Sequence, residues 1–252
     1  MLIDSHVHMP AVHWPDDPRN FLSVGDAVKY LRDSGTNAAI FNTWQGVLAK
    51  NAEDIDKANA DALDLTAEYD GFLYPGLTIN PVYPELSKEW LIRYMELGYK
   101  WVGELVFYCM DYRYTDQAFL DLCAECEKYG HILQLHTSEE ILDVAKTFPG
   151  LSIVCSHIDI DLLPRLAEYE NIVLDISGSA GGLHIGALEK AVKIMGADRL
   201  LYGTDYSSYE PRAFQARLNI SVPDETDRQK IQWQNVQKLL EKAESKPISI
   251  LK

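Results

Sequence analysis

The chain has 252 residues, of which 47% are hydrophobic and 24% are charged. This balance is typical of a globular protein, and no apolar run approaches the ~20 residues that a membrane-spanning helix requires. The formal net charge of −15 would repel a phosphate backbone, and no dense cluster of basic residues offsets it. We therefore expect a small-molecule substrate, and neither a nucleic acid nor a membrane as a partner.

Strands and helices alternate along most of the chain. The pattern predicts strands within residues 1–8 and at residues 37–41, 72–79, 99–107, 131–135, 151–155, 172–176 and 200–203. It predicts helices at residues 23–35, 52–69, 84–97, 116–129, 139–146, 161–169 and 187–195, and an amphipathic terminal helix at residues 223–240. Residues 11–21, rich in proline, aspartate and aromatic residues, are predicted as a loop. Strands that alternate with helices at this spacing indicate parallel βα units.

A polar residue lies at the end of each predicted strand. These residues are His8, Asn42, Asn80, Glu104, His136, His157, Ser177 and Asp205. Their spacing fits eight strand-helix units, and in a (β/α)8 TIM barrel the functional groups lie at the C-terminal ends of the strands. An open, doubly wound sheet is the alternative, but it would not gather residues from five separate strands around one centre. We therefore predict an α/β fold with a single TIM-barrel domain over residues 1–252.

The first strand carries an Asp-x-His-x-His motif. Because side chains alternate along a strand, His6 and His8 project from the same face, roughly 7 Å apart at ~3.3 Å per residue. Two imidazoles on one face can bind a transition metal, but zinc and its neighbours require further nitrogen or oxygen ligands. The ends of the other strands are expected to supply them.

Three later strands also end on groups that can bind metal or transfer protons, namely His136, His157 and Asp205. Together with His6 and His8, and in the same chain order, they resemble the motifs of the amidohydrolase superfamily. The resemblance is to the branch that includes aminocarboxymuconate-semialdehyde decarboxylase and related hydrolases. It covers nearly the whole chain and implies a metal-dependent TIM-barrel enzyme.

The resemblance also implies a role for each residue. His6, His8 and His136 would be metal ligands. His157 would be a catalytic residue, either as a metal ligand or as a group that orients the substrate, and Asp205 would be both a ligand and the catalytic proton acceptor. Zn2+ is the expected ion, with Mn2+ as the alternative because carboxylates join the imidazoles. The site would hold one or two ions.

Glu104, at the end of the fourth strand, departs from the simplest single-metal pattern. Gly103-Glu104 resembles the Gly-Glu of TatD-type barrel hydrolases, in which the glutamate can join two metal centres. In the alternative, Glu104 does not touch the metal and holds one histidine in its tautomer. We predict that Glu104 is a metal ligand.

Several residues just beyond the strand ends are candidates for binding substrate. Trp44, Tyr108 and Tyr206 would supply aromatic walls, and the Arg113 guanidinium would suit a planar carboxylate. His184 lies in the loop after the seventh strand, on the side of the barrel where the site is expected.

These residues favour a metal-dependent hydrolase that cleaves an ester, lactone or amide in a small organic substrate. A divalent ion would activate water, and Asp205 would take the proton and return it to the leaving group. The same motif supports non-oxidative decarboxylation of a small carboxylic acid, and the residues alone do not separate the two reactions. A TatD-like phosphodiesterase or nuclease is the second alternative, which the net charge opposes.

The amino terminus bears on location. It has no basic stretch followed by an apolar segment, and removal of a signal peptide would remove His6 and His8. A cytoplasmic enzyme is therefore expected. Its oligomeric state is left open, including a homo-oligomer.

Overall fold

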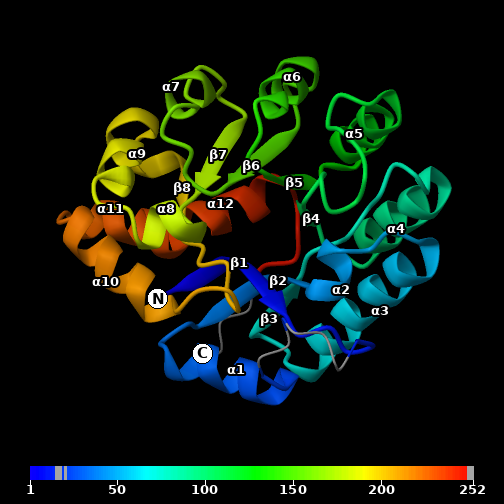
Figure 1. Ribbon diagram of the computed structural model, residues 1–252, viewed down its shortest axis with the longest axis horizontal. Helices are drawn as coiled ribbons and strands as arrows, with labels where there is room; N and C mark the ends of the chain where they lie inside the picture. Colours follow the sequence, from blue (N-terminus) through cyan, green and yellow to red (C-terminus); the bar gives the residue numbers. More distant parts are fainter. Residues whose placement is uncertain (15–18, 20–21, 249–252) are drawn as a thin grey trace.

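Parallel strands form the centre of the molecule, and helices surround them (Figure 1). The computed structural model describes residues 1–14, 19 and 22–248. The strands are β1 (Ile3–Met9), β2 (Ala38–Thr43), β3 (Leu73–Pro75), β4 (Trp101–Leu105), β5 (Ile132–His136), β6 (Ser152–Ser156), β7 (Ile172–Asp175) and β8 (Leu200–Leu201).

The helices lie between successive strands and after β8. They are α1 (Val24–Asp33), α2 (Trp44–Val47), α3 (Ala52–Glu68), α4 (Pro84–Glu96), α5 (Gln117–Tyr129), α6 (Glu140–Thr147), α7 (Leu163–Leu166), α8 (Gly178–Gly182), α9 (Ala187–Met195), α10 (Pro211–Ser221), α11 (Glu225–Gln229) and α12 (Asn235–Lys242). A 3-10 turn at Ala197–Arg199 precedes β8, and a π-helical turn at Lys230–Gln234 joins α11 to α12.

The strands close into a barrel at two seams. Hydrogen bonds order them as β1-β2-β3 in one sheet and as β4-β5-β6-β7-β8 in the other. Leu77, just after β3, forms a parallel bridge to Val102 of β4, and Val7 of β1 forms one to Tyr206 beyond β8. The predicted (β/α)8 TIM barrel is confirmed. Its topology brings the carboxyl ends of the strands to one rim.

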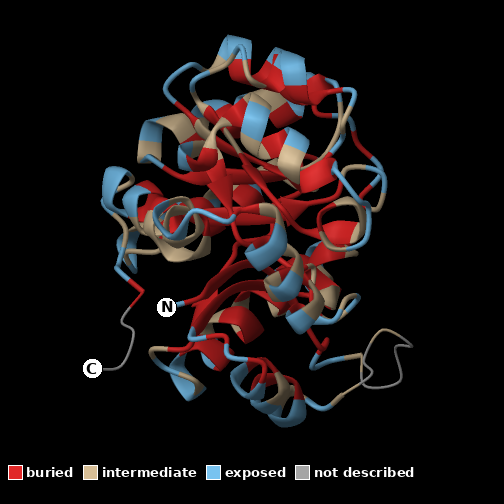
Figure 2. Ribbon diagram, turned by 90° about the vertical axis from the view of Figure 1, so that its left-hand side faces the viewer, coloured by how far each residue is buried: buried red, intermediate tan, exposed pale blue. Residues whose placement is uncertain are grey.

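Buried residues concentrate in the strands and on the helix faces that cover them (Figure 2). Every residue of β1 and β2 is buried, as expected for parallel strands covered on both faces. At the amino ends of the strands, Ile3, Trp101 and Ile132 belong to one apolar cluster with Val236 and Leu240 of α12. Full burial of one such side chain stabilises the fold by ~2 kcal/mol. The terminal helix therefore packs at the end of the barrel opposite the predicted site.

Among the predicted elements that are shorter in the structure, two lose more than half of their length. The strand predicted at residues 72–79 is limited to β3, although the Gly76 N–H still donates to Phe41 O and Leu77 bridges Val102. The helix predicted at residues 161–169 is a single turn, α7, whose entry is a turn in which the Asp159 carboxylate accepts from the backbone N–H groups of Asp161 and Leu162.

The segment after β8 also differs from the prediction. The chain forms α10 there. This helix was not predicted, although Pro211 in its first turn is a common helix start signal. The terminal helix predicted at residues 223–240 is divided into α11, the π-helical turn and α12. The short helices α2 and α8 were not predicted either.

The loop predicted at residues 11–21 is described only in part. Residues 11–14 are neither helix nor strand, and residues 15–18 and 20–21 lie outside the described part of the chain. Among the described helices, none combines the length and the apolarity that a bilayer crossing needs.

Candidate metal centre

β1 delivers two imidazoles to the rim of the barrel. The Nε2 atoms of His6 and His8 lie 3.2 Å apart, and both side chains are buried. Gly203, in the segment after β8, makes room for this strand, because a Cβ there would lie 2.9 Å from the Cβ of His6. Both rings therefore project from the same face of β1, as the motif predicts.

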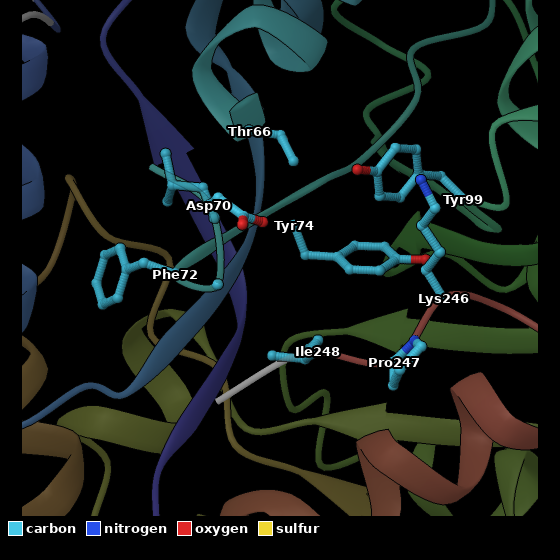
Figure 3. A pocket seen from close by; sticks show the side chains of 10 residues that line it. Thr66, Asp70, Phe72, Tyr74, Tyr99, Lys246, Pro247 and Ile248 are labelled. Carbon is cyan, nitrogen blue, oxygen red and sulfur yellow. The ribbon is translucent and has the colours of Figure 1, made fainter. Parts of the chain in front are cut away.

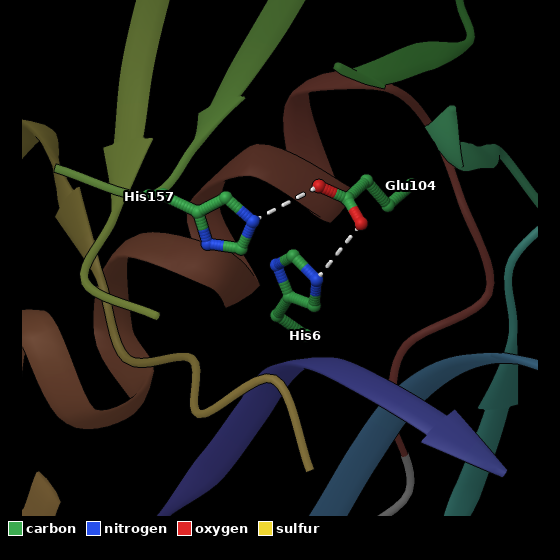
Figure 4. A group of neighbouring side chains, drawn as sticks. All are labelled: His6, Glu104 and His157. Carbon is green, nitrogen blue, oxygen red and sulfur yellow. Dashed lines mark ion pairs between the residues drawn. The ribbon is translucent and has the colours of Figure 1, made fainter. Parts of the chain in front are cut away.

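Glu104 at the end of β4 lies among the histidines, and Figure 4 shows it facing both His6 and His157. Its Oε2 lies 3.2 Å from His6 Nε2 and 3.4 Å from His8 Nε2. Its Oε1 lies 2.9 Å from His136 Nδ1 and 3.4 Å from His157 Nε2. Each carboxylate oxygen thus faces a different pair of imidazoles.

Asp205 completes the cluster from beyond β8. Its Oδ1 lies 3.3 Å from His8 Nε2 and 3.9 Å from His6 Nε2, and its side chain is 15% exposed. Two sets of side chains bring their donor atoms within 4.8 Å of one another: His6 with Glu104 and His157, and His6 with His8 and Asp205. The six predicted ligands therefore meet in one place, with His136 joined to the others through Glu104.

Two of these residues have an unusual backbone conformation. His157 and Asp205 have φ values of 67° and 61°, in the left-handed region that costs a non-glycine residue of order 1 kcal/mol. Gly178 allows the loop after β7 to pass close to His157, because a Cβ there would lie 2.6 Å from its Nδ1. Strain beyond the ends of two strands, on the two residues predicted to be catalytic, is typical of a functional site.

Burial and charge oppose each other in this cluster. Burial lowers the pKa of His6, but the carboxylates of Glu104 and Asp175 outweigh it and hold that pKa well above its usual range. Burial also lowers the pKa values of His8 and His157, and hydrogen bonds to carboxylates again raise them overall. Burial raises the pKa of Glu104, yet the surrounding imidazoles hold it well below its usual range.

The donor set fits a divalent cation. Buried imidazole nitrogens and carboxylate oxygens converge without a lysine or arginine among them, and the raised histidine pKa values show that the cluster favours added positive charge. Imidazole and carboxylate ligands suit Zn2+ and Mn2+. This observation supports the predicted metal site and leaves the choice of ion open.

Asp175, at the end of β7, belongs to the site although it was not predicted from the sequence. This fully buried carboxylate lies 3.0 Å from His6 Nδ1 and accepts from the backbone N–H of His157 at 3.2 Å. An acidic residue in the apolar run Ile172–Asp175 was a usable signal, because an aspartate is rarely buried unless it is paired. Ser177, and not Asp175, was predicted as the polar residue at the end of this strand.

Two of the predicted substrate residues lie beside the cluster. The ring of Trp44 lies 4.6 Å from that of His8, and its Nε1 donates to Ser207 Oγ at 3.1 Å. The Tyr108 hydroxyl lies 3.3 Å from His136 Nε2, and the residue is 58% exposed. Both aromatic side chains therefore touch the rings of predicted ligands.

One other substrate prediction is corrected. Tyr206 is buried in an apolar cluster, stacks on Tyr30 and donates its hydroxyl to Ala27 O, because its bridge to Val7 turns the side chain outward from the site. Arg113 pairs with Glu140, with 2.6 Å between Nε and Oε1, and its side chain is 66% exposed, so its role in binding substrate stays a prediction. His184 is exposed between α8 and α9, and its role stays a prediction.

One cavity lies away from the cluster. A cavity of about 260 Å3 opens at the amino ends of β3 and β4, where Tyr74, Tyr99 and Lys246 line it (Figure 3). The Tyr74 hydroxyl pairs with Ser245 and accepts from the backbone N–H of Lys100, and Lys246 lies over the Tyr99 ring. Their polar ends are thus already engaged within the chain.

Comparison with solved structures supports the fold. The 2,6-dihydroxybenzoate decarboxylase from Rhizobium is 16% identical, covers 95% of this chain and 98% of its own, and has a TM-score of 0.75. The 5-carboxyvanillate decarboxylase from Novosphingobium aromaticivorans, complexed with manganese and 4-hydroxy-3-methoxy-5-nitrobenzoic acid, is 15% identical over 96% of each chain, with a TM-score of 0.77. A proposed 2-pyrone-4,6-dicarboxylic acid hydrolase from Pseudomonas putida is 18% identical over 96% of this chain and 97% of its own, with a TM-score of 0.73.

Sequence comparison gives the family. No curated protein matches the chain significantly. A family model described as amidohydrolase matches residues 3–242, a span that begins at β1 and ends with α12 and so includes every residue of the cluster. The chain therefore belongs to the amidohydrolase family and is an enzyme of that superfamily.

Proposed function

We propose that the protein is a divalent-metal-dependent decarboxylase of a small, planar carboxylic acid. The observation that carries the proposal is the partly exposed carboxylate of Asp205 beside the His6 and His8 imidazoles, with the rings of Trp44 and Tyr108 at the edge of the same cluster. Two of the similar solved structures are decarboxylases of aromatic acids, which supports this reaction over the hydrolysis expected from the sequence.

The residues that would hold the cation are His6, His8, Glu104, His136, His157 and Asp205. When bound, a divalent cation would polarise substrate oxygen atoms and stabilise negative charge that develops on the substrate. Manganese is present in one of the similar decarboxylase structures, so Mn2+ and Zn2+ are both candidates. Their relative activity is a matter for experiment.

The reaction requires one proton from the protein. Decarboxylation breaks the bond between the carboxyl carbon and the ring carbon, releases CO2 and leaves the electron pair on the ring carbon, which then takes up a proton. Asp205 is placed to hold that proton, since its carboxylate is accessible and lies 3.3 Å from His8 Nε2. His157, at the end of β6, would help to hold the cation through Nε2, which lies 3.4 Å from Glu104 Oε1.

A flat substrate would find partners at the rim. Trp44 offers a ring face next to His8, and a stacked aromatic pair contributes ~1 kcal/mol beyond the burial of its surface. The Arg113 guanidinium remains the proposed cation for a substrate carboxylate, because its side chain is 66% exposed.

A direct assay tests the proposal. Chelator-treated protein would be reloaded separately with Mn2+ or Zn2+ and incubated with a panel of hydroxybenzoic acids, and CO2 and the decarboxylated phenol would be measured. We expect release of both in equal amounts from at least one acid, with no turnover before reloading. Turnover of none of these acids, with hydrolysis of lactones or aryl esters by the same preparation, would contradict decarboxylation.

Hydrolysis of an ester, lactone or amide is the second candidate, and one observation favours it. The two oxygens of Glu104 face different histidine pairs, an arrangement that would suit a carboxylate bridging two cations ~3.5–4 Å apart, as in two-metal hydrolases. In that reaction Asp205 would take the proton of the attacking water and return it to the leaving group. The assay above separates the two reactions by their products.

A further inference from the structure

We infer that Asp175 and Ser177 are positioning residues that keep a proton on Nδ1 of both His6 and His157, so that both Nε2 atoms present a lone pair to the proposed metal. The inference rests on the proposed metal centre and extends it to a further strand, β7, that contributes no predicted ligand. One carboxylate would thereby set the orientation of two ligands that come from β1 and β6.

The Asp175 carboxylate receives a different group of donors on each oxygen. Oδ2 lies 3.0 Å from His6 Nδ1 and accepts from Gln134 Nε2 at 2.9 Å. Oδ1 accepts from the Ser177 backbone N–H at 2.9 Å, from the Ser177 hydroxyl and from the His157 backbone N–H at 3.2 Å. A carboxylate surrounded by this many donors acts as an acceptor only.

His6 has its Nδ1 beside the Asp175 carboxylate. If this nitrogen carried no proton, its lone pair would face the lone pairs of Asp175 Oδ2 at 3.0 Å in a fully buried site. Gln134 Nε2 lies 3.2 Å from His6 Nδ1 as well, but it lies closer to Asp175 Oδ2, at 2.9 Å. Gln134 cannot turn over, because its Oε1 accepts from Trp101 Nε1 at 2.8 Å. His6 therefore donates from Nδ1.

The Ser177 hydroxyl has one proton to donate. It lies in very close contact with Asp175 Oδ1, so the proton must lie between these two oxygens, where otherwise only lone pairs would meet. Ser177 Oγ also lies 2.8 Å from His157 Nδ1 and 3.0 Å from His6 Nδ1. Having used its own proton, the hydroxyl can only accept there, so His157 also donates from Nδ1.

Both rings therefore donate from Nδ1 toward the Asp175 carboxylate, His6 directly and His157 through the Ser177 hydroxyl. The nitrogens left without that proton, His6 Nε2 and His157 Nε2, are the atoms that face Glu104. His8 is different, because its Nδ1 has no hydrogen-bond partner among the described residues. The protein thus controls the tautomer of two imidazoles in this cluster through β7.

The decisive variant is Ser177→Ala, with Ser156→Ala as its matched control. Ser156 is also fully buried and precedes His157 directly, but its hydroxyl has no hydrogen-bond partner among the described residues. Nuclear magnetic resonance of protein with 15N-labelled histidine would locate the ring protons, both in the metal-free and in the Zn2+-loaded protein. Zn2+ affinity would be measured by competition with a chromophoric chelator.

We expect slowly exchanging Nδ1 protons on His6 and His157 in the wild-type protein. Ser177→Ala should abolish the slow exchange of the His157 proton. It should leave that of His6, whose Nδ1 loses the Ser177 contact but still faces Asp175 Oδ2 at 3.0 Å. It should also weaken Zn2+ binding by at least ~10-fold, the usual effect of losing a partner of a ligating histidine. Ser156→Ala should change neither. Asp175→Asn should abolish the slow exchange of both Nδ1 protons. If the Asp175→Asn protein fails to fold, the result for Ser177→Ala decides the matter.

Two outcomes would overturn the inference: a His157 ring protonated on Nε2 alone, or a Ser177→Ala protein that keeps the protected His157 proton and full Zn2+ affinity. Failure of the proposed function would look different. If no variant binds Zn2+ or Mn2+, but the Nδ1 protons are present and Ser177→Ala removes only that of His157, the hydrogen-bond chain stands and the metal-dependent function falls.

Discussion

Thr204 holds the buried carboxylate of Asp4 with both its side chain and its backbone. Its Oγ1 donates to Asp4 Oδ2 at 2.6 Å and its N–H donates to Asp4 Oδ1 at 3.1 Å. Asp4 Oδ1 also accepts from the backbone N–H of His6 at 3.2 Å. This contact ties β1, which carries two predicted ligands, to the residue that precedes Asp205.

Thr204→Val should therefore destabilise the fold and impair the site. The change preserves the shape but leaves one oxygen of buried Asp4 without its side-chain donor, at a cost of about 1–3 kcal/mol in the free energy of unfolding. Denaturant unfolding of the metal-free protein would measure it. Thr147→Val is the control, because Thr147 is exposed and donates only within its own helix. Equal stability of the two variants would show that the Asp4 contact is dispensable.

Asp205→Asn should leave the fold intact and lower kcat at least ~100-fold, because the variant cannot carry the proton that the reaction exchanges. Metal content should fall less than activity, since the histidines and Glu104 remain. Steady-state kinetics and elemental analysis of the same preparation would test this. A variant that turns over at the wild-type rate with an unchanged pH profile would reduce Asp205 to a structural residue.

Glu104→Gln should reduce the number of bound ions, because an amide cannot place negative charge between two cations. If Glu104 bridges, elemental analysis of metal-saturated protein should fall from about two ions per chain to about one. Glu140→Gln is the matched control, since Glu140 is also largely buried but pairs with Arg113 outside the cluster. One ion in all three proteins would leave Glu104 to a role in holding the imidazoles.

His131 should make the fold acid-sensitive. Burial lowers its pKa to about 4, and its ring lies between the carbonyls of Leu91 and Lys100 at the start of β5. The unfolded chain binds a proton below about pH 6.5, whereas the native state binds it only below about pH 4. Between these values the unfolded state holds more protons, so stability falls as the pH decreases, by about 3 kcal/mol across the window.

The variant His131→Asn tests this contribution, because asparagine cannot titrate. The free energy of unfolding should depend less steeply on pH between about 6.5 and 4 in the variant than in the wild type. Urea unfolding at a series of pH values would give both curves. Parallel curves would show that other groups cause the acid sensitivity.

Residue patterns along the chain were enough to predict the barrel and the convergence of its ligands. Alternating strands and helices imply parallel units, and parallel units bring strand ends to one rim. Once His6, His8, Glu104, His136 and Asp205 were placed at strand ends, their meeting followed from topology. Strand limits were predicted less well, because a strand ends where its neighbours no longer offer backbone partners, and the apolar pattern does not show where that happens.

The partners of loop and interior side chains were decided only in three dimensions. Arg113 meets Glu140, 27 residues later, and Tyr206 turns away from the site because it bridges Val7. Asp175 contacts His6, which lies 169 residues away in the chain. Local periodicity shows which face a side chain occupies, but hydrogen bonds and ion pairs depend on angstrom distances between remote segments, and these exist only after the barrel has closed.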